Sequence, residues 1–277
     1  MDKGYSILMS VYKKEQPGHL KESIQSILSQ TLKTDNFVLV CDGKLTKELE
    51  QIIKEFQENN PGIFSILRLE RNRGLGIALQ EGLPYCKHEL VARMDSDDIA
   101  KPCRCEKQIE IFCTKQVDIV SGTIEEFNKV PGDRKIYKIL PENQEEIIRY
   151  ARTRNPFNHP AVMFRKTAVE AVNGYQPFYL LEDYYLWVRM LGNGARAYNI
   201  QENLLYMRVG EGMYNRRGGL KYFKSLCRLY HYMRKIHFCT IFDVIKIISG
   251  YFFMCILPGR VRERIYIRKL RRSKNRD

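Results

Sequence analysis

Three carboxylates, Asp95, Asp97 and Asp98, lie within four positions directly after the largely apolar run 90–94. A buried strand that ends in clustered negative charge is costly unless a cation joins it. Carboxylate oxygens are the ligands that a hard divalent metal prefers. The cluster therefore predicts a metal site that holds a diphosphate. A solvated acidic turn is the alternative for an isolated Asp-x-Asp, so the surrounding elements have to decide.

Strands and helices are predicted to alternate through the first half of the chain. Apolar runs predict strands over 5–11, 37–41, 64–67, 90–94 and 117–120, and helical patterns lie between them over 20–28, 49–56, 75–83 and 106–112. This alternation is typical of a parallel α/β sheet. Ligands of such sheets bind beyond the carboxyl ends of the strands, which is where the acidic cluster lies.

Polar residues also follow the first three strands: Tyr12 and Glu15 after the first, Asp42 after the second, and Asn72 and Arg73 after the third. No G-x-G-x-x-G follows the first strand and no Walker-type lysine is present, which disfavours a dinucleotide dehydrogenase and a P-loop enzyme. The pattern that remains is a nucleotide site that neutralises phosphate through a metal.

Composition indicates a globular protein. The 277 residues, 44% of them apolar and 28% charged, can bury a substantial core. The eight cysteines show neither a disulfide-framework spacing nor a paired zinc spacing, and no signal peptide opens the sequence. We therefore expect a reducing, cytoplasmic location.

Positive charge is concentrated at the C-terminal end. The chain carries a net charge of +14, and 258–277 contains nine basic residues against two acidic ones. The preceding stretch 240–257 is mostly apolar but is interrupted by Asp243 and Lys246, which favours a helix lying in a membrane interface over one that spans a bilayer. Basic residues beside it would then contact anionic lipid on the cytoplasmic face. A core-packed helix with a basic tail is the alternative, and no nucleic-acid partner is expected.

A second acidic pair suggests acid–base chemistry. Asp183 follows Glu182 and precedes an apolar helical pattern, so it is expected near a helix N-terminus, where negative charge is favoured. Displacement of a nucleoside diphosphate by a hydroxyl requires a base on the face opposite the leaving group. Asp183 is the candidate for that base, with plain helix capping as the alternative. Glu182 is expected to orient the acceptor.

Taken together, the order and spacing of these segments resemble glycosyltransferase family 2, with the GT-A fold and of the bacterial surface-polysaccharide kind. The matching segments span about 4–208: Ser10-Val11-Tyr12 with Glu15, 20–24, 26–31, Asp42-Gly43, 72–76, 92–98 with Pro102, 155–160, 163–166, Gly174-Tyr175 and 182–187. The resemblance implies a Rossmann-like, mostly parallel sheet flanked by helices, and a hexosyltransferase that moves a sugar from a UDP-sugar to an acceptor hydroxyl with inversion.

The resemblance also implies roles for the donor side. Tyr12, Glu15 and Asp42 would border the uridine, although Cys41 stands where many relatives carry a second acidic residue. Asp97 would contact Mn²⁺ or Mg²⁺ directly, with Asp95 nearer the ribose or a metal-bound water.

The remaining donor-side candidates are mostly basic. Asn72 and Arg73 belong to the donor site, and Arg73 or Arg93 could add a second cation, although Arg93 could equally be a structural partner of the acidic cluster. Arg208 is expected to contact phosphate, although a histidine that relatives often place after this segment is missing here.

On the acceptor side, the resemblance supports Asp183 as the base, and Tyr184 is a candidate for lining the acceptor groove. His159 is either structural or in contact with a sugar, with metal ligation a further alternative. Acceptors of such enzymes are commonly lipid-linked saccharides.

The predicted division places the GT-A domain at 1–212 and C-terminal helices with a basic tail at 213–277. We therefore expect a cytoplasmic enzyme held peripherally on the inner face of the cell membrane. Two other classes stay open at this point: a metal-dependent nucleotidyltransferase, and a non-catalytic protein that binds lipid or polyanion.

Overall fold

Strands and helices alternate through the first half of the protein, as the apolar runs predict. The computed structural model describes residues 4–210, 218–257, 261, 265 and 272–273. The first half contains β1 (Tyr5–Val11), α1 (Pro17–Leu28), β2 (Asn36–Cys41), α2 (Lys47–Asn59), β3 (Phe64–Arg68), α3 (Leu75–Gly82), β4 (Leu90–Asp95), β5 (Ile99–Ala100) and α4 (Arg104–Thr114). The rest contains β6 (Ile119–Phe127), β7 (Ile136–Lys138), α5 (Gln144–Ala151), β8 (Met163–Arg165), α6 (Lys166–Glu170), α7 (Glu182–Gly192), β9 (Ala197–Arg208), α9 (Gly219–Lys235), α10 (Ile241–Ile256) and β10 (Arg272–Ser273). Two short 3₁₀ helices cover Leu83–Tyr85 and His159–Ala161.

One mixed sheet forms the centre of the molecule. Its strand order is β10-β7-β6-β8-β4-β1-β2-β3, with β9 beside β6 and β5 beside β9. The strands β3, β2, β1 and β4 are parallel to one another, as predicted. Beyond β4 the antiparallel strand β8 is inserted, and it pairs in turn with β6. The α/β class is confirmed, and parallel pairing is concentrated on the β1–β4 side.

Strand β6 is longer than its apolar run predicts. The run ends at Val120, whereas the strand continues to Phe127 and all nine of its residues are buried. Beyond the apolar run it carries the polar residues Ser121, Thr123, Glu125 and Glu126, which are each at most 5% exposed. Buried polar side chains in a strand do not produce the apolar pattern from which strands are predicted.

Helices cover both faces of the sheet. Alternate residues of β1 point to opposite faces, so Ile7 and Met9 join the core under α1, α2 and α4, whereas Leu8 joins the core under α3, α5, α6 and α7. The molecule is therefore a three-layer α/β/α arrangement. The carboxyl ends of β1, β2, β3 and β4 meet at one edge of the sheet.

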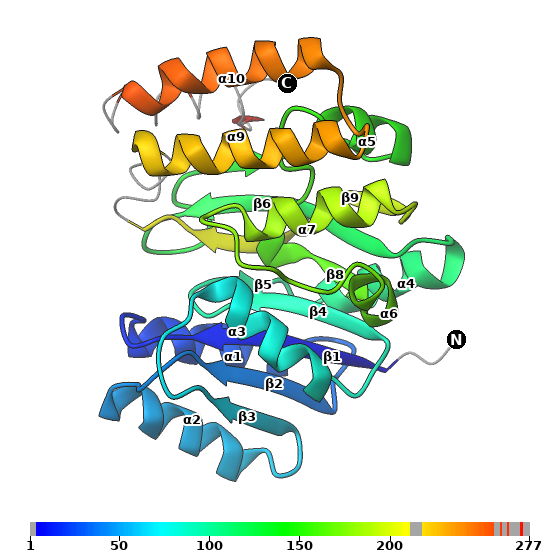
Figure 1. Ribbon diagram of the computed structural model, residues 1–277. Helices are drawn as coiled ribbons and strands as arrows, with labels where there is room; N and C mark the ends of the chain where they lie inside the picture. Colours follow the sequence, from blue (N-terminus) through cyan, green and yellow to red (C-terminus); the bar gives the residue numbers. More distant parts are fainter. Residues whose placement is uncertain (1–3, 211–217, 258–260, 262–264, 266–271, 274–277) are drawn as a thin grey trace.

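The C-terminal helices pack on α7. Leu226 and Leu229 of α9 share a buried cluster with Tyr184 and Val188 of α7, and α10 lies side by side with α9 (Figure 1). The predicted helices of this segment are thus present, and a core of their own joins them to α7. No helix in the described part of the chain is long and apolar enough to cross a membrane. Apart from 261, 265 and 272–273, the predicted basic tail lies outside the described residues.

A close approach of α3 to the sheet yields a stability prediction. A Cβ added at Gly82 would lie 2.6 Å from Val40 Cγ2 and 2.7 Å from Leu8 Cδ1. Gly82→Ala should therefore lower the free energy of unfolding by about 1–3 kcal/mol, because overpacking forces neighbouring side chains to shift. Equilibrium urea unfolding measures the change. The control is Gly18→Ala in α1, where an added Cβ meets nothing within 4 Å and better helix propensity should stabilise slightly. Equal stabilities of the two variants would contradict this account of the packing.

Candidate active site

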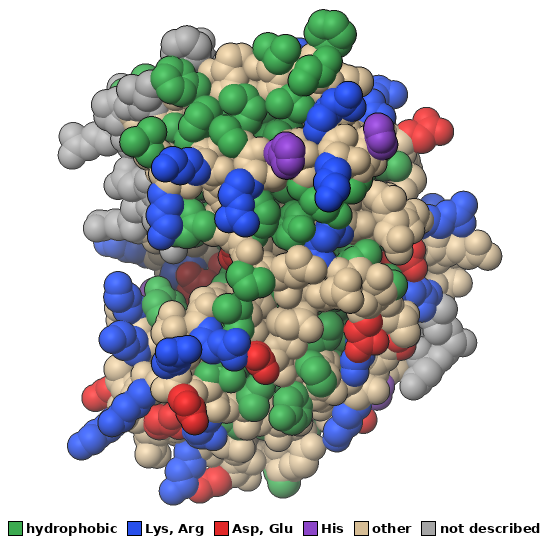
Figure 2. Space-filling model, in the orientation of Figure 1, with side chains coloured by type: hydrophobic (Ala, Val, Ile, Leu, Met, Phe, Trp, Pro, Cys, Tyr) green, Lys and Arg blue, Asp and Glu red, His purple; other side chains and the backbone are tan. Residues whose placement is uncertain are grey.

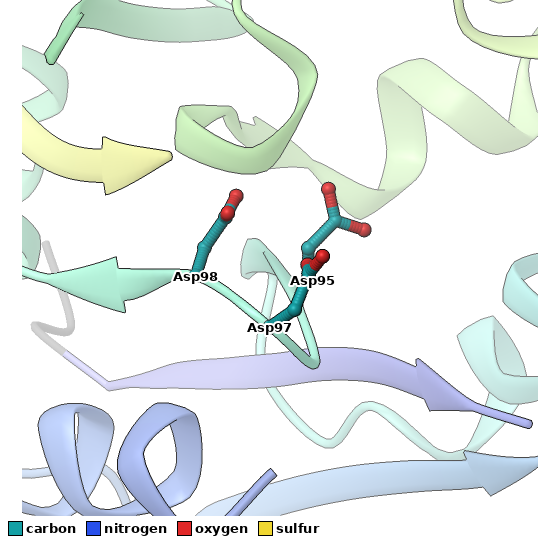
Figure 3. A group of neighbouring side chains, drawn as sticks. All are labelled: Asp95, Asp97 and Asp98. Carbon is teal, nitrogen blue, oxygen red and sulfur yellow. The ribbon is translucent and has the colours of Figure 1, made fainter. Parts of the chain in front are cut away.

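The acidic cluster lies on the tight turn between β4 and β5. Asp95 ends β4, and Asp97 and Asp98 follow before β5 begins at Ile99. One carboxylate oxygen of each aspartate lies within 4.8 Å of the others. Figure 3 shows the three side chains projecting to the same side of the turn. Such a group of oxygen ligands suits Mg²⁺ or Mn²⁺.

The cluster is electrostatically incomplete without a cation. Burial, followed by the charges of Asp95 and Glu15, raises the pKa of Asp97 to about 7. Burial and the two neighbouring aspartates raise the pKa of Asp98 well above its ordinary value. Like charges confined together in a buried site disfavour ionisation, and a divalent ion reverses this effect. The residues present therefore fit a divalent metal.

Asp98 is a candidate ligand that the sequence reasoning left out of its metal pair. The side chain is 1% exposed, and one carboxylate oxygen accepts the backbone N–H of Arg208 at 2.8 Å. The other oxygen has no hydrogen-bond partner among the described residues. A buried, unpartnered carboxylate oxygen beside Asp97 is an available metal ligand. Its direct adjacency to the Asp-x-Asp triplet was the available sequence signal.

Arg93 lies beneath the cluster as a structural partner. Its side chain is 1% exposed, and its guanidinium forms an ion pair with the carboxylate of Asp95. This arrangement matches the structural alternative and leaves two guanidinium nitrogens without a partner in the described part of the chain. Arg208 reaches the turn from β9, where its Nε donates to the Asp97 carbonyl at 3.0 Å and its Nη2 to Glu22 at 2.6 Å.

Asp183 lies in the first turn of α7, as predicted. The N-cap residue of that helix is Leu181, so Asp183 does not serve as the cap itself. One of its carboxylate oxygens accepts from the Tyr184 backbone N–H at 2.7 Å, and the other accepts from Asn155 Nδ2 at 2.6 Å. The carboxylate is thereby fixed in position. Asn155 was noted only as part of a motif, because a contact across 28 positions leaves no local pattern.

Glu182 lies beside Asp183 in a buried position. Burial, followed by the charge of Asp183, raises the pKa of Glu182 to about 7. The side chain also packs closely against α3, since a Cβ at Gly76 would lie 3.0 Å from the Glu182 Cβ. Near neutral pH this carboxyl group can therefore carry a proton and act as a hydrogen-bond donor.

One cavity of about 350 Å³ joins the two acidic groups. It is lined by the acidic cluster and by Glu182 and Asp183. Arg93, His159, Tyr184 and Arg208 also line it. The candidate metal ligands and the candidate base therefore face a common space, as transfer between two substrates requires.

Two of these lining residues are tied to the protein. His159 is 9% exposed and its Nε2 lies 3.0 Å from the Tyr175 hydroxyl. Burial, followed by the charge of Arg93, lowers the pKa of His159 well below its ordinary value, so the ring is neutral. The Tyr184 hydroxyl donates to the Ala151 carbonyl at 2.6 Å. Sugar contacts by these two residues stay predictions.

The five residues predicted to border the nucleotide lie at the neighbouring strand ends and are not among those that line this cavity: Tyr12, Glu15, Asp42, Asn72 and Arg73. Ser96 lies in the acidic turn between β4 and β5, and its Oγ donates to the Glu15 carboxylate. This hydrogen bond joins the cavity to the strand ends that carry the five residues.

Asp42 organises the loop that follows β3. Its two carboxylate oxygens accept the backbone N–H groups of Arg73 and Gly74 at 2.7 and 2.9 Å. Gly43 has a φ of +84°, and a Cβ there would lie 2.6 Å from the Asn72 backbone nitrogen. The Asp42-Gly43 pair therefore fits this close approach of two loops. Arg73 itself pairs with Glu81 on the surface at 2.8 Å.

Comparison with known families decides the class. The family model described as Glycosyl transferase family 2 matches residues 6–172. The protein belongs to glycosyltransferase family 2. The nucleotidyltransferase and the non-catalytic binding protein are thereby set aside.

The enzyme is similar to two bacterial glycosyltransferases whose names state what they do. It is 40% identical over 271 residues to the UDP-Gal:alpha-D-GlcNAc-diphosphoundecaprenol beta-1,3-galactosyltransferase of Escherichia coli, with 97% of each chain covered. It is 40% identical over 227 residues to the amylovoran biosynthesis glycosyltransferase AmsE of Erwinia amylovora, with 82% of this chain and 84% of that one covered.

Solved structures of glycosyltransferases share the fold. The TarS 1–349 complex of S. aureus with UDP-GlcNAc has a TM-score of 0.64 at 16% identity and covers 95% of this chain and 70% of that chain. The mannosyltransferase PcManGT of Pyrobaculum calidifontis, in complex with GDP-Man and Mn²⁺, has a TM-score of 0.62 at 14% identity and covers 95% of this chain and 79% of that one. The GT-A fold implied by the sequence resemblance is thus confirmed.

The raised pKa of Glu182 predicts a pH-dependent effect on the stability of this glycosyltransferase. Between the ordinary pKa of 4.5 and about 7, the unfolded chain releases the Glu182 proton while the folded protein retains it. Stability is therefore lost as pH rises through this window. We compare the free energies of unfolding of Glu182→Gln and wild type in metal-free buffer. The difference between variant and wild type should be more favourable to the variant by about 1–3 kcal/mol at pH 7.5 than at pH 4.

Urea unfolding at the two pH values measures this difference. Gln51→Ala, at an exposed and uncharged position on α2, serves as the control and should show the same difference from wild type at both pH values. A Glu182→Gln difference that does not change with pH would contradict the assignment.

Proposed function

We propose that this enzyme transfers a sugar, with inversion, from a UDP-sugar to a hydroxyl group of a lipid-linked saccharide. The observation that carries the proposal is the shared cavity, which both the acidic cluster and Asp183 line. The Escherichia coli relative is named for a UDP-sugar donor and a diphosphoundecaprenol-linked acceptor. Because 97% of both chains align, this relative supports a UDP-sugar donor and a lipid-linked acceptor for the present enzyme.

The donor site is proposed at the acidic turn between β4 and β5 and at the neighbouring strand ends. A divalent ion held by Asp97, with Asp95 and Asp98 beside it, would supply positive charge that stabilises the departing diphosphate. Arg93 and Arg208 hold this turn in place. Tyr12, Glu15, Asp42, Asn72 and Arg73 lie one to three strands away, where the uridine would extend from the diphosphate.

Asp183 is proposed as the general base. The acceptor oxygen attacks the anomeric carbon, the bond from that carbon to the UDP oxygen breaks, and the acceptor proton passes to the Asp183 carboxylate. Asn155 holds this carboxylate through a 2.6 Å hydrogen bond, and the N-terminus of α7 favours its negative charge. Glu182, His159 and Tyr184 line the same cavity and are proposed to border the acceptor.

A membrane surface is proposed as the place where the acceptor is met. The outward side of α10 exposes Ile241, Phe242, Ile245 and Phe252, with Phe242 79% and Ile245 61% exposed. Figure 2 shows hydrophobic side chains gathered over α10 and basic side chains over α9 beneath them. Residues 218–257 carry six basic side chains against one acidic. Apolar side chains flanked by positive charge suit the interface of an anionic bilayer.

Two substitutions should separate donor binding from transfer. Asp97→Ala should abolish Mn²⁺-dependent UDP binding, measured by isothermal titration calorimetry, because it removes the proposed direct ligand. Asp183→Asn should retain UDP binding while the transfer rate, measured by UDP release from a panel of UDP-sugars beginning with UDP-Gal, falls at least about 100-fold.

Asparagine is close in size and shape to aspartate, so the Asp183→Asn variant should fold as wild type does. Full transfer by Asp183→Asn would remove the assignment of the base. Unchanged Mn²⁺-dependent UDP affinity in Asp97→Ala would remove the assignment of the metal site.

The exposed side of α10 yields a membrane-binding prediction. Phe242→Ser combined with Ile245→Ser should reduce partition onto phosphatidylglycerol vesicles at least about tenfold, because two exposed apolar side chains lose their burial in lipid. Co-sedimentation with the vesicles measures the bound fraction. The control is Val130→Ser, which changes a 61% exposed side chain on the loop after β6. Equal vesicle binding by all three proteins would contradict the proposed surface.

A further inference from the structure

The cavity continues past Asp183 to a wall that the catalytic half does not provide. Tyr222 and Leu226 of α9 and Tyr251 of α10 line it together with the acidic cluster. Tyr222 and Leu226 are nearly fully buried. The C-terminal helices therefore form part of the substrate space as well as the outer surface of the molecule.

Two basic residues line the same cavity. Lys138 ends β7, and Arg154 lies in the loop that follows α5. Arg154 immediately precedes Asn155, whose side chain holds Asp183, so its backbone lies near the proposed base and its side chain lines the same cavity. In the part of the chain that the structure describes, no carboxylate lies within ion-pair distance of Arg154.

The cavity lining thus carries charges of both signs. The three carboxylates of the acidic cluster repel phosphate unless a divalent ion is present. Lys138 and Arg154 attract phosphate directly, and an arginine fork matches phosphate oxygens well. A cavity of this kind can hold two anionic substrates by different means, one through a metal and one through side chains.

Apolar and aromatic side chains line the same cavity as the two basic ones. Leu226, Tyr222 and Tyr251 border the cavity, while Phe252 of the same helix α10 is 45% exposed on the outside. A ligand that combines a phosphate with a hydrocarbon chain would find both kinds of surface here. A free sugar has neither the phosphate nor the hydrocarbon chain.

We propose that Lys138 and Arg154 form a subsite for the phosphate groups of the acceptor, with Tyr222, Leu226 and Tyr251 contacting the first part of its hydrocarbon chain. The ligand class is a saccharide linked through phosphate to an alkyl or polyprenyl chain. This inference rests on the proposed function and deepens it. It assigns to this end of the cavity a recognition of phosphate that does not use the metal.

The test compares two soluble acceptors, GlcNAc-diphosphate carrying an undecyl chain and undecyl GlcNAc without phosphate. Direct binding of each to the full-length protein is measured by isothermal titration calorimetry in EDTA, so the result does not depend on transfer. Arg154→Gln and Lys138→Gln are the variants. Arg149→Gln, an exposed position on α5 outside the cavity lining, is the charge-matched control.

Each variant should weaken binding of the diphosphate acceptor at least about tenfold, because a hydrogen bond to a charged group is lost. Binding of undecyl GlcNAc and Mn²⁺-dependent binding of UDP should stay unchanged, as should all three affinities in Arg149→Gln. Where transfer is measurable, the KM for the diphosphate acceptor should rise while kcat changes little.

Several results would overturn the subsite. Equal losses with both acceptors would indicate a general disturbance of the cavity. A loss confined to UDP binding would assign the two cations to the donor diphosphate. No loss with any ligand would show that the two side chains do not bind the acceptor. Failure of wild type to transfer sugar, with the predicted binding differences intact, would instead refute the proposed function alone.

Discussion

Mutual repulsion among three clustered carboxylates, of which Asp98 is buried, is the constraint on which the site depends. Asp95, Asp97 and Asp98 share one short turn, and two of them have strongly raised pKa values because burial adds to the repulsion. The surrounding chain offsets this only in part. Arg93 neutralises Asp95 from below, and Arg208 gives Asp98 one backbone N–H. The side of the turn that faces the cavity stays negative, which is the condition a metal site requires.

The fold brings this turn opposite a second acidic group of different character. Parallel pairing of β1 and β4 places Asp95 at the edge where the other strand ends meet. Helix α7, packed on the same sheet, presents Asp183 across the cavity with its carboxylate held by Asn155. The first group is a cluster short of positive charge. The second is a single carboxylate supplied with hydrogen-bond donors, so the two groups suit different steps of one transfer.

The sequence predicts the first half of this arrangement well for a physical reason. Parallel strands are covered on both faces, so β1 and β4 appear as nearly continuous apolar runs whose ends are clear. The acidic turn and Asp183 were recognised because their segments carry local motifs. Insertion of β8 between β4 and β6 could not be predicted, since strand order depends on tertiary contacts that no local run encodes.

Individual contacts were missed for a related reason. Asn155 acts on Asp183 from 28 positions away, and Lys138 and Arg154 reach the cavity only through the placement of β7 and of the loop after α5. Tyr184 was expected in the acceptor groove from its neighbourhood to Asp183, and it does line the cavity. The turn of the helix nevertheless buries its ring, and its hydroxyl is bound to Ala151.

The wall supplied by α9 and α10 has a consequence for the competing reaction with water. A sugar activated by a departing diphosphate can be captured by any hydroxyl that reaches it, and bulk water is far more abundant than a lipid-linked alcohol. Tyr222 and Leu226 are nearly fully buried where they close this side, so solvent has less access to the space beside the base. In the proposed reaction, the helical pair would therefore favour synthesis over hydrolysis of the donor.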